Sequence, residues 1–216
     1  MRPVEGGLTP VSLFERAEAV LVDLDGTLVD STRPVRRAWD EFAARHGLDA
    51  ETVMHFAHGR PSRDSIQLLL PDASELEIDT EAARLDDGEI NDTEGVIALP
   101  GAFALLSGTR PLAIVTSAST ALARGRLAAA ELPIPEVLVS SDGLEQGKPD
   151  PSCFLIAAER LGVEPQRCVV LEDAPAGILA GLRAGAVVIA VRTTHEDDEL
   201  GEATAIVDDL ASLLGG

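Results

Sequence analysis

Polar side chains that could act together on a phosphate ester occur in four clusters, most of them directly after short apolar runs. The four clusters are Asp23 with Asp25, Thr116 with Ser117, Lys148, and Glu172 with Asp173. Carboxylate oxygens are the ligands that Mg²⁺ prefers, whereas hydroxyl and ammonium groups donate hydrogen bonds to phosphate oxygens. If the fold brings these clusters together, the sequence predicts a Mg²⁺ site beside a phosphate-binding site.

Three of these clusters, each taken alone, also have a purely structural explanation. Asp25-Gly26 could form a tight turn, whereas Thr116-Ser117 and Glu172-Asp173 could each cap a following helix. These explanations do not account for three carboxylates gathered at one edge of a sheet. Like charges at such short range destabilise one another unless a cation neutralises them, which favours a metal-binding site.

The apolar runs predict buried strands of a parallel sheet, separated by helices rich in Ala and Leu. The expected strands are Ala19–Val22, Pro111–Val115, Glu136–Val139, Cys168–Leu171 and Val187–Val191. The expected helices are Ser119–Ala130, Pro151–Leu161 and Ala176–Ala184. This alternation indicates an α/β fold with a Rossmann-like, doubly wound parallel sheet. The carboxyl ends of such strands share one edge, where ligands bind, so the four clusters are expected to converge there.

Residues 32–96 interrupt the alternation of strands and helices. Apolar residues between Val35 and Ala43 recur at the spacing of one helical face, and further helices are expected up to about residue 86. The sequence therefore predicts a core domain formed by residues 1–31 and 97–216. The intervening residues would form a small all-helical domain.

Composition narrows the classes of partner. A formal net charge of −20 makes nucleic acid and anionic membranes unfavourable partners. No apolar run approaches the roughly 20 residues that a membrane span needs, and the first residues do not resemble a signal peptide. Cys153 and Cys168 lack the spacing of a metal site, so we expect small buried side chains in a reducing compartment. We expect a monomeric, cytoplasmic protein that acts on a small molecule.

In their order along the chain, the four clusters match the four motifs of the haloacid dehalogenase superfamily. The first motif corresponds to Asp23-Leu24-Asp25-Gly26-Thr27, and the resemblance extends over nearly the whole chain. The stretches Ala113–Ser117 and Leu171–Gly177 most resemble the sugar-phosphate phosphatase branch of that superfamily. Members of this branch carry a helical cap domain at the place that residues 32–96 occupy here.

The resemblance implies a role for each cluster in a Mg²⁺-dependent phosphatase. Asp23 would attack phosphorus to form an aspartyl-phosphate, and Asp25 would act as the general acid and base. The groups implied to hold the phosphoryl group are the backbone around Gly26 and the side chains of Thr116, Ser117 and Lys148. The groups implied to hold Mg²⁺ are Asp23, the main-chain carbonyl of Asp25 and Asp173, with Glu172 behind these ligands.

Substrate choice is expected to depend on the cap. Residues 58–64, with the sequence HGRPSRD, resemble the specificity loop of sugar-phosphate members of the family, so the candidate substrate residues are His58, Gly59, Arg60 and Arg63. Alternatively, the two arginines could simply balance acidic residues nearby on the cap. The expected substrates are small sugar or polyol phosphates, with hexose phosphates first and glycerol phosphate second.

Two other functions fit parts of the same pattern. A sugar phosphomutase of the β-phosphoglucomutase type resembles the chain closely. Such enzymes carry an acidic residue and a histidine where this chain has Arg33-Pro34-Val35, and an aliphatic residue at the position of Thr27. A non-enzymatic receiver-like domain would need neither an acid–base group two residues beyond the phosphorylated Asp nor a cap. The departures from the mutase pattern favour hydrolysis, and the presence of Asp25 and of a cap favours an enzyme over a receiver domain.

Overall fold

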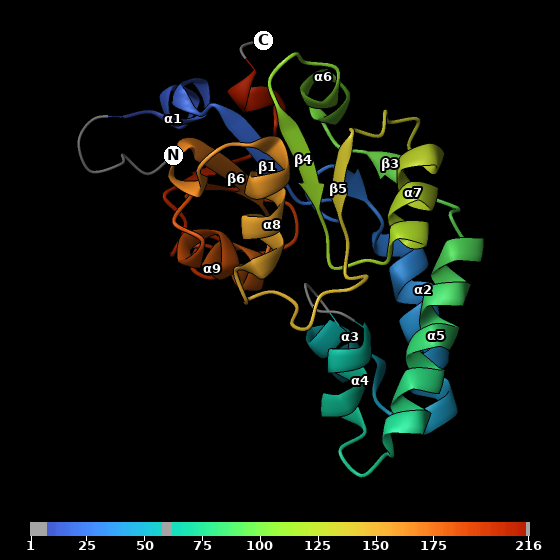
Figure 1. The fold of residues 1–216 in the computed structure, drawn as a ribbon. Coiled ribbons are helices and arrows are strands. Elements are labelled where there is room, and N and C mark those ends of the chain that lie inside the picture. Colours follow the sequence, from blue (N-terminus) through green and yellow to red (C-terminus); the bar gives the residue numbers. More distant parts are fainter. Residues whose placement is uncertain (1–7, 58–61, 215–216) are drawn as a thin grey trace.

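The computed structural model describes residues 8–57 and 62–214. Its core is a six-stranded parallel sheet with the strand order β5-β4-β1-β6-β7-β8. Figure 1 shows β5, β4, β1 and β6 side by side. The strands are β1 Ala19–Val22, β4 Leu112–Val115, β5 Val137–Val139, β6 Cys168–Glu172, β7 Val187–Val191 and β8 Ala205–Val207. The five predicted strands are present, and β8 is a sixth strand that the sequence analysis did not include.

Helices cover both faces of this sheet, so the predicted doubly wound α/β fold is confirmed. Along β1, Val20 and Val22 pack into one apolar cluster, whereas Ala19 and Leu21 pack into another on the opposite face. The first face is covered by α1 Pro10–Arg16, α6 Ala102–Leu106, α7 Thr120–Ala129 and the short helix η2 Ala211–Leu213. The second face is covered by α8 Ser152–Leu161 and α9 Pro175–Arg183, with η1 Pro165–Arg167 leading into β6. Strands buried on both faces explain the continuous apolar runs of the sequence.

Among the described residues of the segment 32–96, which we refer to as the cap, four helices lie beside the sheet (Figure 1). They are α2 Thr32–His46, α3 Ala50–Ala57, α4 Ser62–Leu69 and α5 Glu75–Asn91. They enclose an apolar cluster of their own, which includes Trp39, Phe42 and Ile66. At the start of α5 the Ser74 side chain accepts a hydrogen bond from the Glu77 N–H, and the Glu77 side chain accepts one from the Ser74 N–H. This capping box explains where the helix begins. Helix α5 continues past the expected end near residue 86, and its far end reaches the core.

Two short antiparallel strands join the cap to the core. β2 Val29–Asp30 pairs with β3 Ile97–Ala98, at the points where the chain leaves the core and returns to it. The sequence analysis did not predict this pair because two-residue strands carry no periodicity of their own. Helix α5 also packs against α7 of the core, so the cap contacts the core through a helix as well.

Two smaller expectations concern membranes and cysteines. Within the two described ranges, no helix combines the length and the apolar character that crossing a bilayer requires. Cys153 and Cys168 are both buried and carry free thiols, as expected for small apolar side chains. Burial raises the pKa of both thiols, which lowers their reactivity.

Candidate active site

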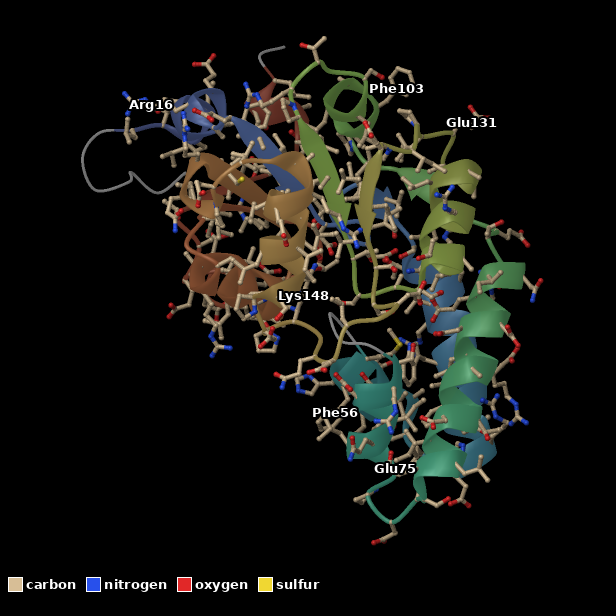
Figure 2. The ribbon with its side chains drawn as sticks, in the orientation of Figure 1. Arg16, Phe56, Glu75, Phe103, Glu131 and Lys148 are labelled. Carbon is tan, nitrogen blue, oxygen red and sulfur yellow. The ribbon has the colours of Figure 1, made fainter. Side chains whose placement is uncertain are left out.

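The carboxyl ends of β1, β4 and β6 border a cavity of about 540 Å³ whose wall also includes cap residues. The cavity brings together every predicted core residue: Asp23, Asp25, Gly26, Thr116, Ser117, Lys148, Glu172 and Asp173. Figure 2 shows Lys148 on the side of the core that faces the cap. From the cap, Arg63 lines the same cavity. The other predicted cap residues, His58, Gly59 and Arg60, lie outside the described residues.

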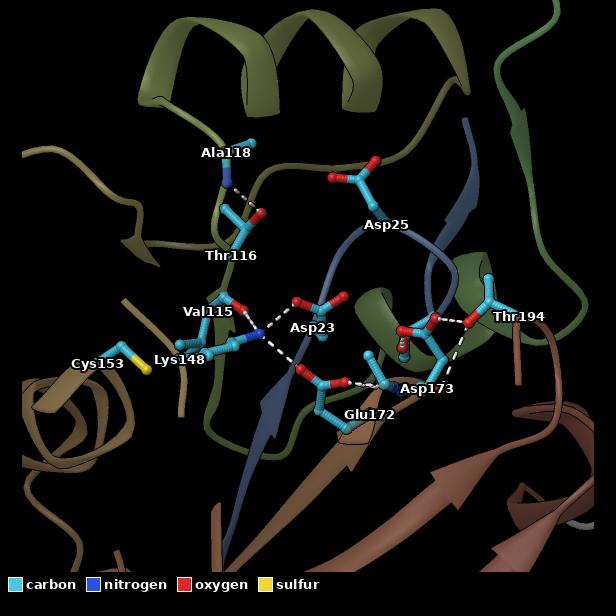
Figure 3. A network of polar contacts seen from close by, with 12 residues as sticks. Asp23, Asp25, Val115, Thr116, Ala118, Lys148, Cys153, Glu172, Asp173 and Thr194 are labelled. Atoms are coloured by element: carbon cyan, nitrogen blue, oxygen red, sulfur yellow. Dashed lines mark hydrogen bonds and ion pairs between the residues drawn. The ribbon is translucent and has the colours of Figure 1, made fainter. Parts of the chain in front are cut away.

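Lys148 lies at the centre of the buried charges and is the only lysine among the 216 residues. Its Nζ donates hydrogen bonds to Asp23 Oδ1 at 2.5 Å, to Glu172 Oε1 at 2.7 Å and to the Val115 carbonyl at 3.1 Å (Figure 3). Burial raises the pKa of Asp23 well above its usual value, although Lys148 opposes that shift. Burial lowers the pKa of Lys148, but the carboxylates of Asp23 and Glu172 outweigh it and raise that pKa. The lysine therefore stays charged.

Asp173 follows β6 and is held by hydroxyl groups from two other segments. Thr27 Oγ1 donates to Asp173 Oδ1 at 3.0 Å. The hydroxyl of Thr194 donates to Asp173 Oδ2, as Figure 3 shows. Burial, together with the charge of neighbouring Glu172, raises the pKa of Asp173 to about 7. Only glycine fits at Gly26, because its φ is +85° and a Cβ there would lie 2.1 Å from Asp173 Oδ2. Thr194 was not among the site residues predicted from the sequence.

Glu172 has hydrogen-bond donors at both of its carboxylate oxygens. Oε1 accepts from Lys148, and Oε2 accepts from the backbone N–H groups of Asp173 at 2.8 Å and Ala174 at 2.9 Å. A Cβ at Gly177 would lie only 1.6 Å from Oε1, so glycine in α9 leaves the space that Glu172 fills. Glu172 is thus oriented toward Lys148 and the start of α9.

Three carboxylates meet where a cation could be held. Asp23, Glu172 and Asp173 each offer an oxygen, and these oxygens lie within 4.8 Å of one another. Lys148 supplies a single positive charge against three acids in a buried place, so further positive charge would be stabilising. Oxygen ligands at this spacing fit a hard divalent ion such as Mg²⁺. Since Glu172 already accepts three hydrogen bonds, Asp23 and Asp173 are the better-placed ligands.

Asp25 is held by a separate set of contacts. Ser31 Oγ donates to Asp25 Oδ1 at 2.6 Å, and Arg126 Nη1 donates to Asp25 Oδ2 at 2.5 Å. The second terminal nitrogen of Arg126 contacts the carboxylate of Glu89 in α5, and both of these side chains are buried. Burial raises the pKa of Glu89 to about 7, although Arg126 opposes that shift. Ser31, Glu89 and Arg126 were not among the site residues predicted from the sequence.

The sequence did hold a signal for two of these missed residues. Arg126 follows the buried Leu122 by one helical turn, and Glu89 follows the buried Leu85 by one turn. A charged side chain on the apolar face of a helix predicts a buried partner, because an unpaired charge there is costly. The identity of that partner is not a local property, since Glu89 and Arg126 are separated by 37 positions.

The hydroxyl pair after β4 is not explained by helix capping. The side chain that caps α7 is Ser119, which accepts a hydrogen bond from the Leu122 N–H. Thr116 is buried, its Oγ1 accepts from the Ala118 N–H at 3.0 Å, and Ser117 lies beside it in the cavity wall. Both residues therefore remain candidates for contacts with a ligand.

Arg63 is paired with acidic residues of the cap, which is the alternative to substrate binding that the sequence left open. Its Nε donates to Asp79 Oδ1 at 2.8 Å, and another guanidinium nitrogen contacts Glu75, so two acids of α5 balance its charge. The same side chain is half-exposed and also lines the cavity. A contact with substrate would have to share the arginine with these two acids.

Comparisons with known proteins agree with this arrangement. The family model for haloacid dehalogenase-like hydrolases matches residues 17–185. Hexitol phosphatase A of Escherichia coli (strain K12) is 46% identical over 202 residues, which cover 92% of this chain and 94% of that protein. Glycerol-1-phosphate phosphohydrolase 1 of Saccharomyces cerevisiae is 32% identical over 210 residues, with coverages of 90% and 82%.

A solved structure is similar over the same extent. The crystal structure of β-phosphoglucomutase from Clostridium difficile superposes with a TM-score of 0.78 at 25% identity, covering 91% of this chain and 93% of that one. The chain therefore shares its overall fold with a solved structure over nearly its whole length. With a family model matching most of its length and relatives above 30% identity, the chain belongs to the haloacid dehalogenase-like hydrolases.

Proposed function

We propose that this chain is a Mg²⁺-dependent phosphatase that hydrolyses small sugar or polyol phosphates through an aspartyl-phosphate. The observation that carries the proposal is the different setting of two carboxylates after β1. Asp23 is bound to Lys148 within the buried charge cluster, whereas Asp25 is bound to Ser31 and Arg126 beside the same cavity. Two acids with distinct environments suit a nucleophile and an acid–base group.

The proposed reaction has two steps. Asp23 attacks phosphorus while the bond to the substrate's alcohol oxygen breaks, and Asp25 gives its proton to that departing oxygen. Asp25 then takes a proton from the water that attacks the aspartyl-phosphate, which releases phosphate and restores Asp23. The groups that we assign to the phosphoryl oxygens are the backbone around Gly26 and the side chains of Thr116, Ser117 and Lys148.

We assign Mg²⁺ to Asp23, the main-chain carbonyl of Asp25, and Asp173, with Glu172 behind them. When bound, the ion would supply positive charge beside the phosphoryl oxygens and relieve the repulsion among these carboxylates. Thr27 supports the assignment because its hydroxyl fixes one oxygen of Asp173. Glu172 would contribute through its hydrogen bond to Lys148.

The cavity suits an uncharged polyol that carries a single phosphate. Its cap wall includes Asp64, Asp86 and Glu89, while Arg63 is already paired with two acids. Carboxylates accept hydrogen bonds from hydroxyl groups and repel a second phosphate. The volume of about 540 Å³ is typical of small-ligand sites. We therefore place hexose phosphates, and the hexitol phosphates suggested by the name of the bacterial relative, ahead of glycerol phosphate.

The second candidate function is sugar phosphomutase, which the likeness to β-phosphoglucomutase favours. Two features oppose it. Arg33-Pro34-Val35 occupies the place where the mutases carry an acidic residue and a histidine, and Thr27 supplies a hydroxyl to Asp173 where they carry an aliphatic side chain. A mutase would also convert one sugar phosphate into another without releasing phosphate, so product analysis separates the two functions.

We also propose how the chain divides into domains, which cap residues contact the substrate, and the oligomeric state and location of the protein. We propose residues 32–96 as the cap and residues 1–31 and 97–216 as the core, with the strands β2 and β3 at the junction. His58, Gly59, Arg60 and Arg63 are proposed to contact the polyol. We propose a monomer in the cytoplasm, and the net charge of −20 is the reason for proposing neither nucleic acid nor membrane as a partner.

Phosphate release tests this function directly. The purified chain is incubated with hexose, hexitol and glycerol phosphates, with Mg²⁺ or with a chelator, and inorganic phosphate is measured. We expect turnover that requires Mg²⁺ and is lost in Asp23→Asn, whereas Asp40→Asn, the same change at a half-exposed residue of α2 that does not line the cavity, keeps it. Turnover by Asp23→Asn, or turnover in chelator, would falsify the mechanism. Isomerised sugar phosphate without phosphate release would support the mutase.

A further inference from the structure

A buried arginine links the carboxylate of Asp25 to the cap. Arg126 lies in α7 of the core and is 4% exposed, while Glu89 lies in α5 of the cap and is 6% exposed. One terminal nitrogen of Arg126 donates to Asp25 Oδ2 at 2.5 Å, and the other contacts a carboxylate oxygen of Glu89. A single side chain thus bridges two acids that belong to different parts of the molecule.

The chemistry of the guanidinium group makes this bridge directional. It is planar, stays charged, and presents its two terminal nitrogens in a fixed geometry, so a contact at one of them restricts where the other can point. Glu89 therefore restrains the orientation of Arg126. Arg126 in turn restrains Asp25, whose side chain is 28% exposed and lines the cavity. The buried setting strengthens both contacts, because little water competes for them.

We propose that Arg126 is a positioning residue for the acid–base group Asp25, and that Glu89 positions Arg126. The cap would then influence catalysis through a chain of two ion pairs, in addition to any contact with substrate. The inference rests on the proposed function, because it takes Asp25 to be the proton donor to the leaving alcohol. Ser31, which binds the other oxygen of Asp25, completes the support of that carboxylate.

The leaving group of the substrate separates positioning from a merely structural role. A polyol leaves as a strongly basic alkoxide unless Asp25 protonates it, so a misplaced Asp25 slows that reaction. Nitrophenolate is a stable anion and needs little protonation. The value of kcat/KM reports the first chemical step, so loss of positioning lowers it for a polyol phosphate and spares it for p-nitrophenyl phosphate.

The test measures kcat/KM for both substrates in Glu89→Gln, Arg126→Lys and Arg126→Met, with Mg²⁺ present. For the polyol phosphate we expect a loss of about tenfold in Glu89→Gln and about a hundredfold in Arg126→Met, with Arg126→Lys between them. For p-nitrophenyl phosphate we expect less than about a threefold loss in each. The matched controls are Arg124→Met and Asp87→Asn, exposed residues of the same two helices, which should change neither value.

Equal losses for the two substrates, or no loss for either, would overturn the proposal. Glu89→Gln keeps the size of the side chain, so it decides the question if Arg126→Met does not fold. Because Glu89 acts through Arg126, adding Glu89→Gln to Arg126→Met should cost less than about twofold more. Asp25→Asn separates this inference from the proposed function: if Asp25→Asn itself lowers both substrates equally, the role of Asp25 is wrong.

Discussion

The charged groups of the core and those of the cap are set in opposite ways. In the core, Lys148 is buried between Asp23 and Glu172, with 4% of its side chain exposed. In the cap, Arg63 pairs with Glu75 and Asp79, with 42% of its side chain exposed. A buried ion pair is strongly disturbed when one partner is removed, whereas an exposed pair contributes little. We therefore expect the catalytic steps to depend on the buried ion pairs of the core. We expect substrate preference to depend on the solvent-exposed ion pairs of the cap.

The replacement Lys148→Met tests the buried side of this comparison and has the largest expected effect. It leaves Asp23 and Glu172 without their shared cation and removes positive charge beside the phosphoryl group. We expect kcat/KM to fall about 10³-fold, which corresponds to about 4 kcal/mol of transition-state stabilisation. The measurement is phosphate release from a hexose or hexitol phosphate in saturating Mg²⁺.

The control for this replacement is Arg160→Met, which removes an exposed cation from α8. It should leave kcat/KM within about twofold of the original value. If Lys148→Met kept a tenth of the activity, the buried cluster would not carry the chemistry. The burial of Lys148 can be checked separately in the unsubstituted protein with a reagent that modifies amines. Because Lys148 is the only lysine and is buried, only the amino terminus of the chain should react readily.

The site residues predicted from the sequence are marked by local patterns, whereas those that were missed are defined by contacts between distant segments. Asp23, Thr116 and Asp173 each follow an apolar run, so their convergence at one sheet edge followed from the fold class alone. The bridge from Glu89 to Arg126 was missed because its two ends lie in different parts of the molecule. Each end showed only a charge on an apolar helix face, and the sequence does not say which charges meet.

The secondary structure was likewise predictable where the local sequence pattern is strong and not where an element depends on distant contacts. The strand β6 was predicted because Cys168–Leu171 is a continuous apolar run, and in the structure the strand extends one residue further to the buried Glu172. The strand β8, Ala205–Val207, and the helix α1, Pro10–Arg16, are short, and each depends on packing against distant elements for its stability. Helix α5 was predicted to end near Asp86, but it continues to Asn91 and contacts α7, a distant element that local sequence does not identify.

Glu89 is an exception to the contrast between buried core charges and exposed cap charges, because it belongs to the cap and is buried. Burial raises its folded-state pKa to about 7, above the ordinary 4.5, so the folded chain holds this proton more tightly than the unfolded chain. The stabilisation this gives is complete below about pH 4.5 and is lost as the pH rises through 7. Relative to Glu89→Gln, which does not titrate, the wild type should lose roughly 3 kcal/mol of unfolding free energy between pH 4.5 and 8.

Urea unfolding of both proteins across this pH range measures the difference. Loss of the ion pair with Arg126 adds an offset of either sign, so the slope with pH is the informative quantity. The exposed change Asp87→Asn on the same helix should show no such slope. A flat difference for Glu89→Gln would mean that Arg126 keeps Glu89 charged throughout this pH range.

Metal binding should stabilise the core alone. Mg²⁺ at a hundredfold excess over its Kd is expected to raise the unfolding free energy by about 2.7 kcal/mol, seen as a rise in Tm. The replacement Asp173→Asn removes a proposed ligand and should abolish most of this rise. The replacement Asp86→Asn, on the cap side of the same cavity, should leave the rise unchanged. A rise that Asp86→Asn abolishes instead would place the ion against the cap.

The smallest effect is expected for Arg63→Met, on the exposed side of the comparison. The replacement removes two ion pairs that water can solvate, so the unfolding free energy should change by less than about 1 kcal/mol. If Arg63 also reaches the polyol, kcat/KM should shift by about two- to tenfold and by different factors for hexose, hexitol and glycerol phosphates. Arg84→Met, an exposed arginine of α5 paired with Glu81, should leave those ratios unchanged. A uniform loss near a hundredfold would show that Arg63 serves the phosphoryl group common to all three substrates, and the cap would then share in the chemistry as well as in the choice of substrate.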